Sequence, residues 1–355
     1  MQSIRSQADV LEVQTWGCAS LRELARDSED RGWLGRLGGI ELVLQAMRSF
    51  EDVDLQVSGA QALGMLSYEH AVNANLVLQH GGLELLIRGM HRHYDNEAVQ
   101  ASGLSSLQLL CSFEELREHF VQLQGLQMVF AALERHPLQG PGCGLLGRLA
   151  YGNREHLRLI CDMGGAAVAL EALNSLEAET LAPAAALLGN LALEMDLEPT
   201  AAPLLVEALR HEAVEVKEAA VNALKNVCVR TPKALETAAA AGAYEALAFV
   251  QTEKTRLLTT SLLSLLCEAA PELSEDFRKA GGLTELLATM RDHTAFKAQE
   301  QLATILHCLG QSSAQQILEA QGLSLLLRAM HLFPGSAKIQ ARWETHAFAC
   351  VSGVF

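Results

Sequence analysis

The sequence lacks several features that are common in other classes of protein, beginning with a long apolar run. No run reaches the ~18 to 20 residues that a membrane-spanning helix needs. The longest, Leu181–Leu193, is interrupted by Pro183 and Asn190. Charged residues occur throughout the first thirty positions and no N-x-Ser/Thr sequon is present, so neither a signal peptide nor a secreted glycoprotein is indicated. We expect a protein without membrane insertion, in the cytoplasm or also in the nucleus.

Closely spaced cysteines are also missing. The chain has 8 cysteines, and none of them form a metal-ligand or redox motif. Cys111, Cys228 and Cys267 each follow a core Leu or Val at the same position of a repeating pattern. They are expected to behave as small buried hydrophobic residues in a reducing compartment.

Basic residues are scarce, because 27 Lys and Arg stand against 42 Asp and Glu, a net charge of -15. About half of this excess lies between Glu171 and Glu218, where the basic residues are Arg210 and Lys217. Such a surface repels nucleic acids and anionic membranes, so neither is an expected partner. Other proteins with basic extended segments suit it better. Alternatively, the acidic residues serve only to keep a long apolar chain soluble.

Motifs that carry catalysis are absent or lack their structural context. The run Gly142–Gly147 has the spacing of a dinucleotide-binding loop, but no strand pattern precedes it. The loop His91–Asp95 has too few ligands for a metal site without a partner elsewhere. His307 and Cys308 are adjacent helical residues, which point about 100° apart and cannot form a catalytic dyad. We expect no enzyme activity, no cofactor and no metal.

What the chain does contain is a repeated segment. Gly81 to Met90 consists of two glycines and an apolar run that ends in Met, and Gly38 to Met47 has the same form. The pattern returns about every forty residues, which is the spacing of helical solenoid repeats. Only 5% of the residues are aromatic while half are hydrophobic, a composition suited to packing helix on helix. The anchor positions are Gly39, Gly82, Gly125, Gly165, Ala202 in place of glycine, Gly242, Gly282 and Gly322.

Each full unit is predicted to contain three helices. In the second unit these span 72–80, 83–92 and 96–111, with Gly81 and Gly82 between the first two. A glycine just past a helix end adopts the left-handed conformation that stops the helix, and its missing side chain allows neighbouring helices to approach. Asp52 and Asn96 stand where a third helix needs an N-cap.

This three-helix pattern resembles the armadillo repeat. The resemblance rests on the anchor runs 280–287 and 320–327, and above all on 184–192 (AAALLGNLA) and 218–228 (EAAVNALKNVC). It implies an all-α, right-handed α-solenoid of about eight armadillo-like repeats, forming a single domain over residues 1–355. It also implies a non-catalytic scaffold or adaptor that binds other proteins along a concave groove lined by the third helices.

Some units depart from the pattern. A first helix from about Val10 to Arg26 and a last one over 337–351 are predicted to be partial capping repeats. The fifth unit is expected to have two helices, because the stretch 194–199 leaves little room for another. In the third unit, Pro137 and the run 140–142 are expected to shorten the start of the last helix.

The resemblance also points to binding residues. It implies that one third-helix position often holds an asparagine whose amide binds the backbone of an extended partner. Only Asn190 and Asn226 match, and the tryptophan expected four residues earlier is absent, which argues against an import receptor of the importin-α type. Each Asn could instead cap a loop between repeats through a local hydrogen bond. The predicted partner-binding residues are Arg148, Asn190, Asn222, Lys225, Asn226, Glu215 and Glu218.

Two other classes of function stay open at this point. The chain could be a structural subunit of a larger assembly, in which case Trp33, Phe50 and Trp343 should be buried against a neighbour. It could also be a regulatory region associated with an enzyme. The sequence does not distinguish these from the scaffold.

Overall fold

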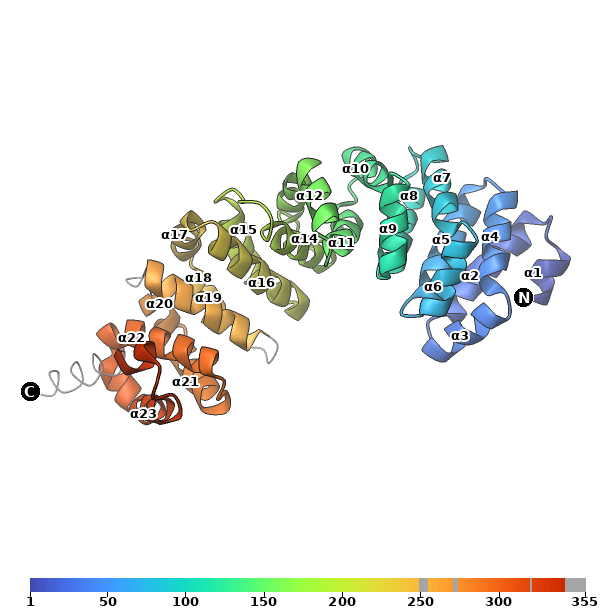
Figure 1. Ribbon diagram of the computed structural model, residues 1–355. Helices are drawn as coiled ribbons and strands as arrows, with labels where there is room; N and C mark the ends of the chain where they lie inside the picture. Colours follow the sequence, from blue (N-terminus) through green and yellow to red (C-terminus); the bar gives the residue numbers. More distant parts are fainter. Residues whose placement is uncertain (249–254, 271–273, 320, 342–355) are drawn as a thin grey trace, which may run out of the picture. The chain divides into compact units, whose positions relative to one another are not determined.

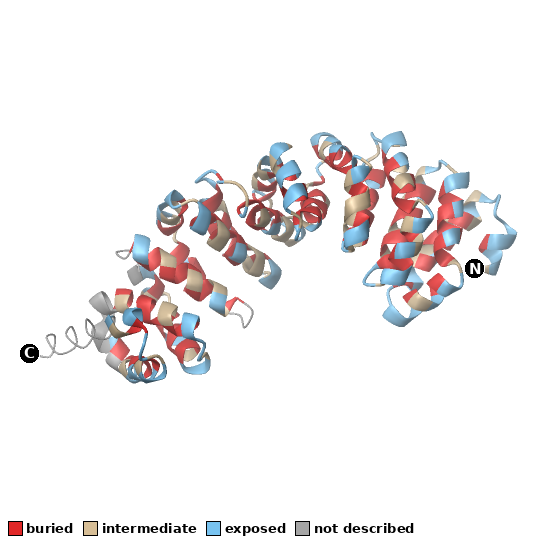
Figure 2. Cartoon of the chain, viewed as in Figure 1, coloured by how far each residue is buried: buried red, intermediate tan, exposed pale blue. Residues whose placement is uncertain are grey.

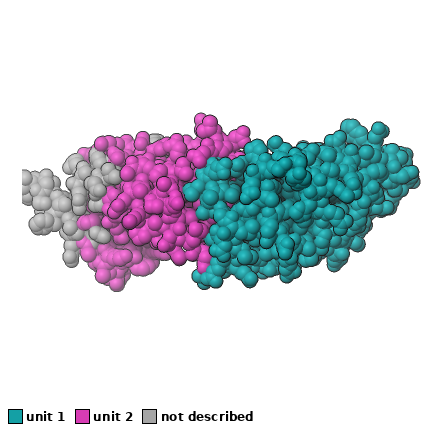
Figure 3. Space-filling model, turned by 90° about the horizontal axis from the view of Figure 1, so that it is seen from above, with its two compact units in different colours: residues 1–172 teal, residues 173–355 magenta. Residues whose placement is uncertain are grey.

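The computed structural model describes residues 1–248, 255–270, 274–319 and 321–341, and within these ranges the regular structure is α-helical, with no strand (Figure 1). Two compact units are present, Met1–Ala172 and Leu173–Phe355 (Figure 3). None of the helices in the described ranges combines the length and apolar character that crossing a membrane requires. The expected all-α solenoid fold is confirmed.

Unit 1 consists of a short helix pair, three complete three-helix units, and two helices of a further unit. In each complete unit we refer to the helices as first, second and third in chain order. The pair is α1 (Gln2–Ser6) and α2 (Leu11–Leu24); the complete units are α3 (Ser28–Arg36), α4 (Gly39–Ser49) and α5 (Val53–Ser67), then α6 (Ala71–Gln79), α7 (Gly82–Arg92) and α8 (Glu97–Leu110), then α9 (Glu114–Gln122), α10 (Gly125–Arg135) and α11 (Gln139–Ala150); the remaining helices are α12 (Arg154–Asp162) and α13 (Gly165–Ala172).

Unit 2 begins with a third helix and continues in the same order. In chain order, unit 2 starts with α14 (Ala178–Leu191), α15 (Ala201–Ala208), α16 (Val214–Arg230), α17 (Lys233–Ala240), α18 (Ala243–Ala248) and α19 (Arg256–Ala269). These are followed by α20 (Ser274–Lys279), α21 (Gly282–Asp292), α22 (Phe296–Glu319) and α23 (Gly322–Leu332).

The third helices form the spine of each unit. In unit 1, α5 packs against α2 and α8, and α8 packs against α11; in unit 2, α16 packs against α14 and α19, and α19 packs against α22. The buried residues lie on the sides of the helices that face their neighbours (Figure 2). Leu63, Leu66, Leu104 and Leu107 in this spine have no exposed surface. Burial of each such leucine side chain stabilises the folded chain by roughly 1.5–3 kcal/mol.

The paired glycines have different roles, as Gly81 and Gly82 illustrate. Gly81 has φ 66° and ends α6 in the left-handed conformation, which only glycine adopts without a steric cost. Gly82 begins α7 against α6, and a Cβ on it would lie 2.4 Å from Val77 Cγ1. The first glycine therefore turns the chain, and the second allows two helices to touch.

A buried glutamine fastens the third helix to the end of the second helix. Gln56 Nε2 donates to the carbonyl oxygens of Met47 and Phe50 at 2.9 and 2.8 Å. Gln100 Nε2 donates in the same way to Met90 and His93 at 2.8 and 3.0 Å. Because the last carbonyls of a helix have no partner within it, these bonds satisfy buried carbonyls such as that of Met90, and they give the carbonyl of His93 a second donor besides the N–H of Asn96. We call this arrangement the glutamine clamp; it recurs at Gln14 and Gln299.

The N-terminal helices differ from the expectation. The predicted helix Val10–Arg26 is α2, Leu11–Leu24, and the sequence did not indicate the helix α1 before it. Gln14 clamps the carbonyls of Ile4 and Gln7, both at 2.9 Å, as Gln56 clamps the end of α4. The guanidinium of Arg5 donates to the carbonyl of Leu37. By these contacts α1 takes the place of a second helix, so the partial unit begins earlier than expected.

Other departures from regularity were expected from the sequence. No helix lies between α14 and α15, so the fifth unit has two helices. The expectation that the start of α11 is shortened is wrong: α11 begins at Gln139, as far after Gly125 as α5 begins after Gly39, and contains the run 140–142, because proline is tolerated in the first turn of a helix. Its 12 residues instead end earlier, at Ala150. One difference was not expected: α22 runs for 24 residues without a break, so the third helix of one unit continues into the first helix of the next. The helix predicted over 337–351 is helical at 337–341, and its remainder lies outside the described residues. The single domain and the handedness stay predictions.

Candidate partner-binding surface

The predicted site residues of unit 2 lie on α14 and α16, which cross closely. Gly189 faces Ala223, and a Cβ on Gly189 would lie 3.0 Å from Ala223 Cα. The absence of a side chain at Gly189 is what allows the two backbones to approach, since real Cβ contacts are longer. The crossing places the exposed side of α16 next to that of α14.

Five of the predicted residues share one side of α16. Spacings of three and four residues put helical side chains on the same face. Glu215 and Asn222 are exposed, whereas Glu218, Lys225 and Asn226 are half-buried. The face therefore carries two carboxylates, two amides and one cation, which suits hydrogen bonding to a peptide backbone.

Asn226 already has a partner within the fold. Its Nδ2 donates to the backbone carbonyl of Gly189 at 3.0 Å, so one donor of the amide joins α16 to α14. The bond is made to a neighbouring helix and not to a loop. Asn190, on α14, is half-buried. A role for either amide in holding a partner stays a prediction.

Arg148 lies in the other compact unit, and a common surface with these residues stays a prediction. It is exposed on α11 of unit 1, whereas the other six predicted residues lie in unit 2. The structure thus places Glu215, Glu218, Asn222, Lys225 and Asn226 together and assigns Arg148 to a different compact unit.

A second candidate surface, not predicted from the sequence, lies between α2 and α5 in unit 1. A groove of about 450 Å³ runs between these two stacked third helices. Trp16 stands in its wall with 74% of its surface exposed. We call this the Trp16 groove; its lining residues are Leu11, Glu12, Thr15, Trp16, Ala19, Asp52, Asp54, Val57 and Ser58.

The Trp16 groove combines an apolar floor with a negative rim. Glu12, Asp52 and Asp54 are exposed, and no Lys or Arg lines the groove. Asp52 Oδ1 caps α5 by accepting from Leu55 N at 3.1 Å, while Glu12 and Asp54 take part in no ion pair within the described residues. An indole face flanked by carboxylates attracts an Arg or Lys side chain through both cation–π and charge interactions.

A hollow of similar size lies on the other side of Trp16. Its volume is about 450 Å³, and residues of α1 and α2, including Ile4, Val13 and Gly17, line it together with Trp16. The indole therefore stands on a ridge between two depressions. The sequence carries a signal for this exposed indole, because Trp16 lies outside the apolar side of its helix, which is formed by Val13, Cys18 and Leu21.

The chemical motifs considered in the sequence lie in ordinary helical surroundings. The glycine run Gly142–Gly147 is part of α11. No group of three or more His, Cys, Asp or Glu side chains suited to a metal ion occurs in the part of the chain that the structure describes. Cys308 Sγ lies 3.8 Å from the carbonyl oxygen of Cys267, on a neighbouring third helix. Both thiols are buried.

Comparison with known proteins supports the fold. No protein-family model matches the chain. Protein aardvark from Dictyostelium discoideum is 31% identical over 96 residues, which is 23% of this chain and 13% of that protein. The chain thus matches only a small part of the length of this relative.

Among solved structures, the crystal structure of an engineered protein superposes with a TM-score of 0.67 at 19% identity, covering 96% of both chains. A designed armadillo repeat protein is similar over 60% of this chain and 93% of its own length, with a TM-score of 0.47 and 18% identity. The three-helix units described above place the chain in the class of helical repeat proteins. These units and the superposition on the engineered protein show an armadillo-like repeat fold.

Proposed function

We propose that this chain is a non-catalytic scaffold or adaptor that binds segments of other proteins on the exposed faces of its third helices. The observation that carries the proposal is the Trp16 groove, where a largely exposed indole lies beside unpaired carboxylates. Exposing a tryptophan to water is unfavourable unless a ligand covers it, and tryptophan is enriched among the residues that dominate binding energy.

The charge of the chain supports a basic partner. The net charge of -15 favours association with a cationic segment and opposes nucleic acid or an anionic membrane. An Arg or Lys side chain stacked on an exposed indole gains roughly 0.5–1 kcal/mol, and flanking carboxylates add to this. The α14–α16 face, with Glu215 and Glu218, offers a second acidic surface in unit 2. A preformed surface of this kind binds without the entropic cost of ordering the receptor.

The test uses Trp16 as its own reporter. The chain has 3 tryptophans, so replacing Trp33 and Trp343 by Phe leaves the indole of Trp16 as the sole tryptophan signal. Titration with an extended Arg- and Lys-rich peptide is expected to change this fluorescence saturably, and Glu12→Gln with Asp54→Asn is expected to weaken binding. The matched control is Glu29→Gln with Asp30→Asn, two exposed carboxylates at the start of α3. Unchanged fluorescence over the titration would count against the groove.

A structural subunit is the second candidate. Trp33, Leu37 and Val72 are exposed by 59, 50 and 65% on the first helices and their ends. This apolar surface would suit permanent contact with a neighbouring subunit. Phe50 is half-buried, and Trp343 lies outside the described residues. Partners lost from Trp33→Ala but kept by Trp16→Ala at high salt would favour this candidate over the scaffold.

A further inference from the structure

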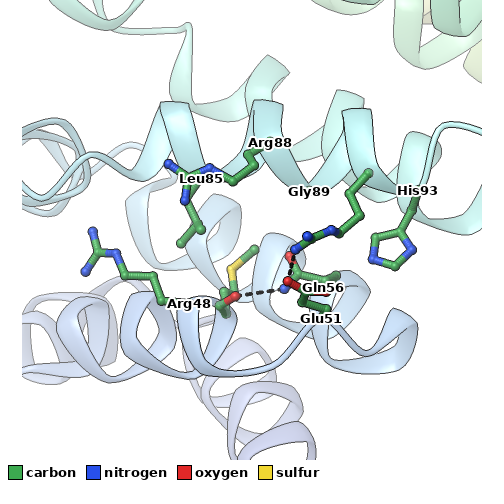
Figure 4. Close-up of a pocket in the computed structure, with 9 residues that line it drawn as sticks. Arg48, Glu51, Gln56, Leu85, Arg88, Gly89 and His93 are labelled. Carbon is green, nitrogen blue, oxygen red and sulfur yellow. Dashed lines mark hydrogen bonds and ion pairs between the residues drawn. The ribbon is translucent and has the colours of Figure 1, made fainter.

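A small pocket between α4 and α7 has a charge opposite to that of the chain. It lies between two stacked second helices of unit 1 and has a volume of about 100 Å³ (Figure 4). Gly89 in its wall helps to leave this space, since a Cβ there would lie 2.9 Å from Gln56 Oε1. Arg48, Arg88 and Arg92 line the pocket, and its one carboxylate is Glu51. In a chain of net charge -15, this is a local excess of positive charge.

The three guanidinium groups differ in the hydrogen bonds and ion pairs that they form with the rest of the protein. Arg92 forms an ion pair with Glu51. Arg48 donates to the carbonyl oxygen of His80 at the end of α6, which fixes its direction. Arg88 is exposed and forms no hydrogen bond or close ion pair within the described ranges, and its charge acts on the carboxylate of Glu84 one helical turn earlier. Because a guanidinium carries five N–H donors, all three keep donors to spare.

The figure shows how these groups are arranged. Arg48 from α4 and Arg88 from α7 extend toward the same end of the pocket, and His93 lies at the other end (Figure 4). His93 Nε2 is shielded from solvent and has no hydrogen-bond partner. The carboxylate of Glu84 is outside the lining; its Oε1 is hydrogen-bonded to His119 Nε2 at 2.8 Å, and its Oε2 is shielded from solvent without a hydrogen-bond partner. Three guanidinium groups therefore outnumber the one carboxylate, that of Glu51, in the lining of the pocket.

We propose that this pocket binds a single phosphate group, with Arg88 as its principal ligand and Arg48 as the second. Guanidinium groups match the oxygens of phosphate in geometry, and hydrogen bonds between charged groups are the strong ones. The volume admits one tetrahedral oxyanion and not a nucleotide. The pocket is distinct from the Trp16 groove and from the α14–α16 face. The phosphate proposal can therefore be tested independently of the scaffold proposal.

The experiment is calorimetric titration of the full chain with inorganic phosphate at low ionic strength. Saturable binding is expected, and Arg88→Gln is expected to weaken it about tenfold or more, because one charge-assisted pair is lost. Arg36→Gln, which removes an exposed arginine of α3 stacked on Trp33, is the matched control and should leave binding unchanged. Absence of saturable binding, or equal binding by Arg88→Gln and wild type, overturns the proposal.

The source of the phosphate is decided by a second arm. A peptide with one phosphoserine is compared with inorganic phosphate and with the same peptide unphosphorylated. Tighter binding of the phosphopeptide, lost in Arg88→Gln, assigns the pocket to a phosphorylated partner. Equal binding of phosphopeptide and inorganic phosphate assigns it to free phosphate. Equal binding of the two peptides by wild type, with no dependence on Arg88, contradicts a phosphate site.

Discussion

Asn226 and Gly189 are joined across two third helices by a hydrogen bond of 3.0 Å between the side-chain amide and the backbone carbonyl. Gly189 is also the residue whose missing side chain lets α14 and α16 approach. The asparagine that the armadillo resemblance marks as a binding residue thus has a structural contact at the same place. A substitution of Asn226 would therefore change stability as well as any contact with a partner, so the two effects need separate measurements.

Asn226→Ala is expected to lower the free energy of unfolding by about 0.5–1.5 kcal/mol, because it removes one intramolecular hydrogen bond. Asn222→Ala, one helical turn earlier on the exposed surface, should change it by less than about 0.5 kcal/mol. Denaturant midpoints of the two variants decide this. Equal midpoints would show that the bond to Gly189 contributes nothing, and would return Asn226 to the list of free binding residues.

Gln100→Leu tests the glutamine clamp. The substitution keeps the side chain's approximate size but leaves the carbonyls of Met90 and His93 without this side-chain donor. We expect a loss of about 1–3 kcal/mol, since the buried carbonyl of Met90 becomes unsatisfied while that of His93 keeps the backbone N–H of Asn96. Gln122→Leu on the exposed side of α9 is the control. If chemical denaturation gives similar losses for both, the clamp is not a stabilising device.

Gln124→Gly is expected to stabilise the chain. Gln124 has φ 59° and occupies the position that Gly81 fills with φ 66°. A left-handed conformation costs a residue with a side chain roughly 1–2 kcal/mol, partly offset by the larger entropy of unfolded glycine. A net gain of about 0.5–1 kcal/mol should appear as a raised melting temperature. The reverse change, Gly81→Ala, should lower it, and a lowered value for Gln124→Gly would contradict the argument.

Acidic pH should weaken the contact between Glu84 and His119. Burial acts to raise the pKa of Glu84, but the hydrogen bond and charge of His119, together with a backbone hydrogen bond and Arg88, outweigh it and hold this pKa below its usual range. The folded state therefore favours the ionised carboxyl, and its contribution is present above the ordinary Glu pKa of about 4.3 and is lost as pH falls through the lowered value.

The measurement is the melting temperature of wild type and Glu84→Gln at decreasing pH. Glu84 is partly exposed, so the effect is screened and modest. Wild type should be the more stable near pH 6, and the difference should shrink below about pH 4. A difference that stays constant over this range would exclude the carboxylate as its cause.

Buried thiols should react slowly. Burial raises the pKa of Cys18, Cys143 and Cys228 to about 12, so almost no thiolate is present at pH 8. Among the cysteines in the described ranges, Cys161 is only half-buried and should be modified before the buried ones by a maleimide reagent. Peptide mapping by mass spectrometry gives the order, with the unfolded chain as the control. Early labelling of Cys18 or Cys143 in the folded chain would contradict the described core.

The repeat was predictable because its signals are local. Gly81 marks a helix end by its conformational freedom, and Gly82 beside it marks the close approach of α7 to α6. These are short-range effects, and the sequence displays them directly. The absence of a helix before α15 was predictable for the same reason, because the proline and acidic residues of the stretch 194–199 form no apolar helix face that could be buried.

Features that depend on distant contacts could not be predicted. Helix α1 spans 5 residues with Ile4 as its buried side chain, far too few for an isolated helix. It is held by Gln14 and by the bond from Arg5 to Leu37. The Trp16 groove likewise needs α5, thirty to forty residues further along, to supply its second wall. Chain order alone does not show which helices meet.

The glutamine clamp has a consequence for how such a chain changes over evolutionary time. Each clamp closes within one unit, as Gln100 shows by bonding to Met90 and His93 just before it. A duplication or deletion that begins and ends between units carries donor and acceptors together. Copies can therefore be gained or lost without stranding a buried carbonyl, and the length of the array is free to vary under selection.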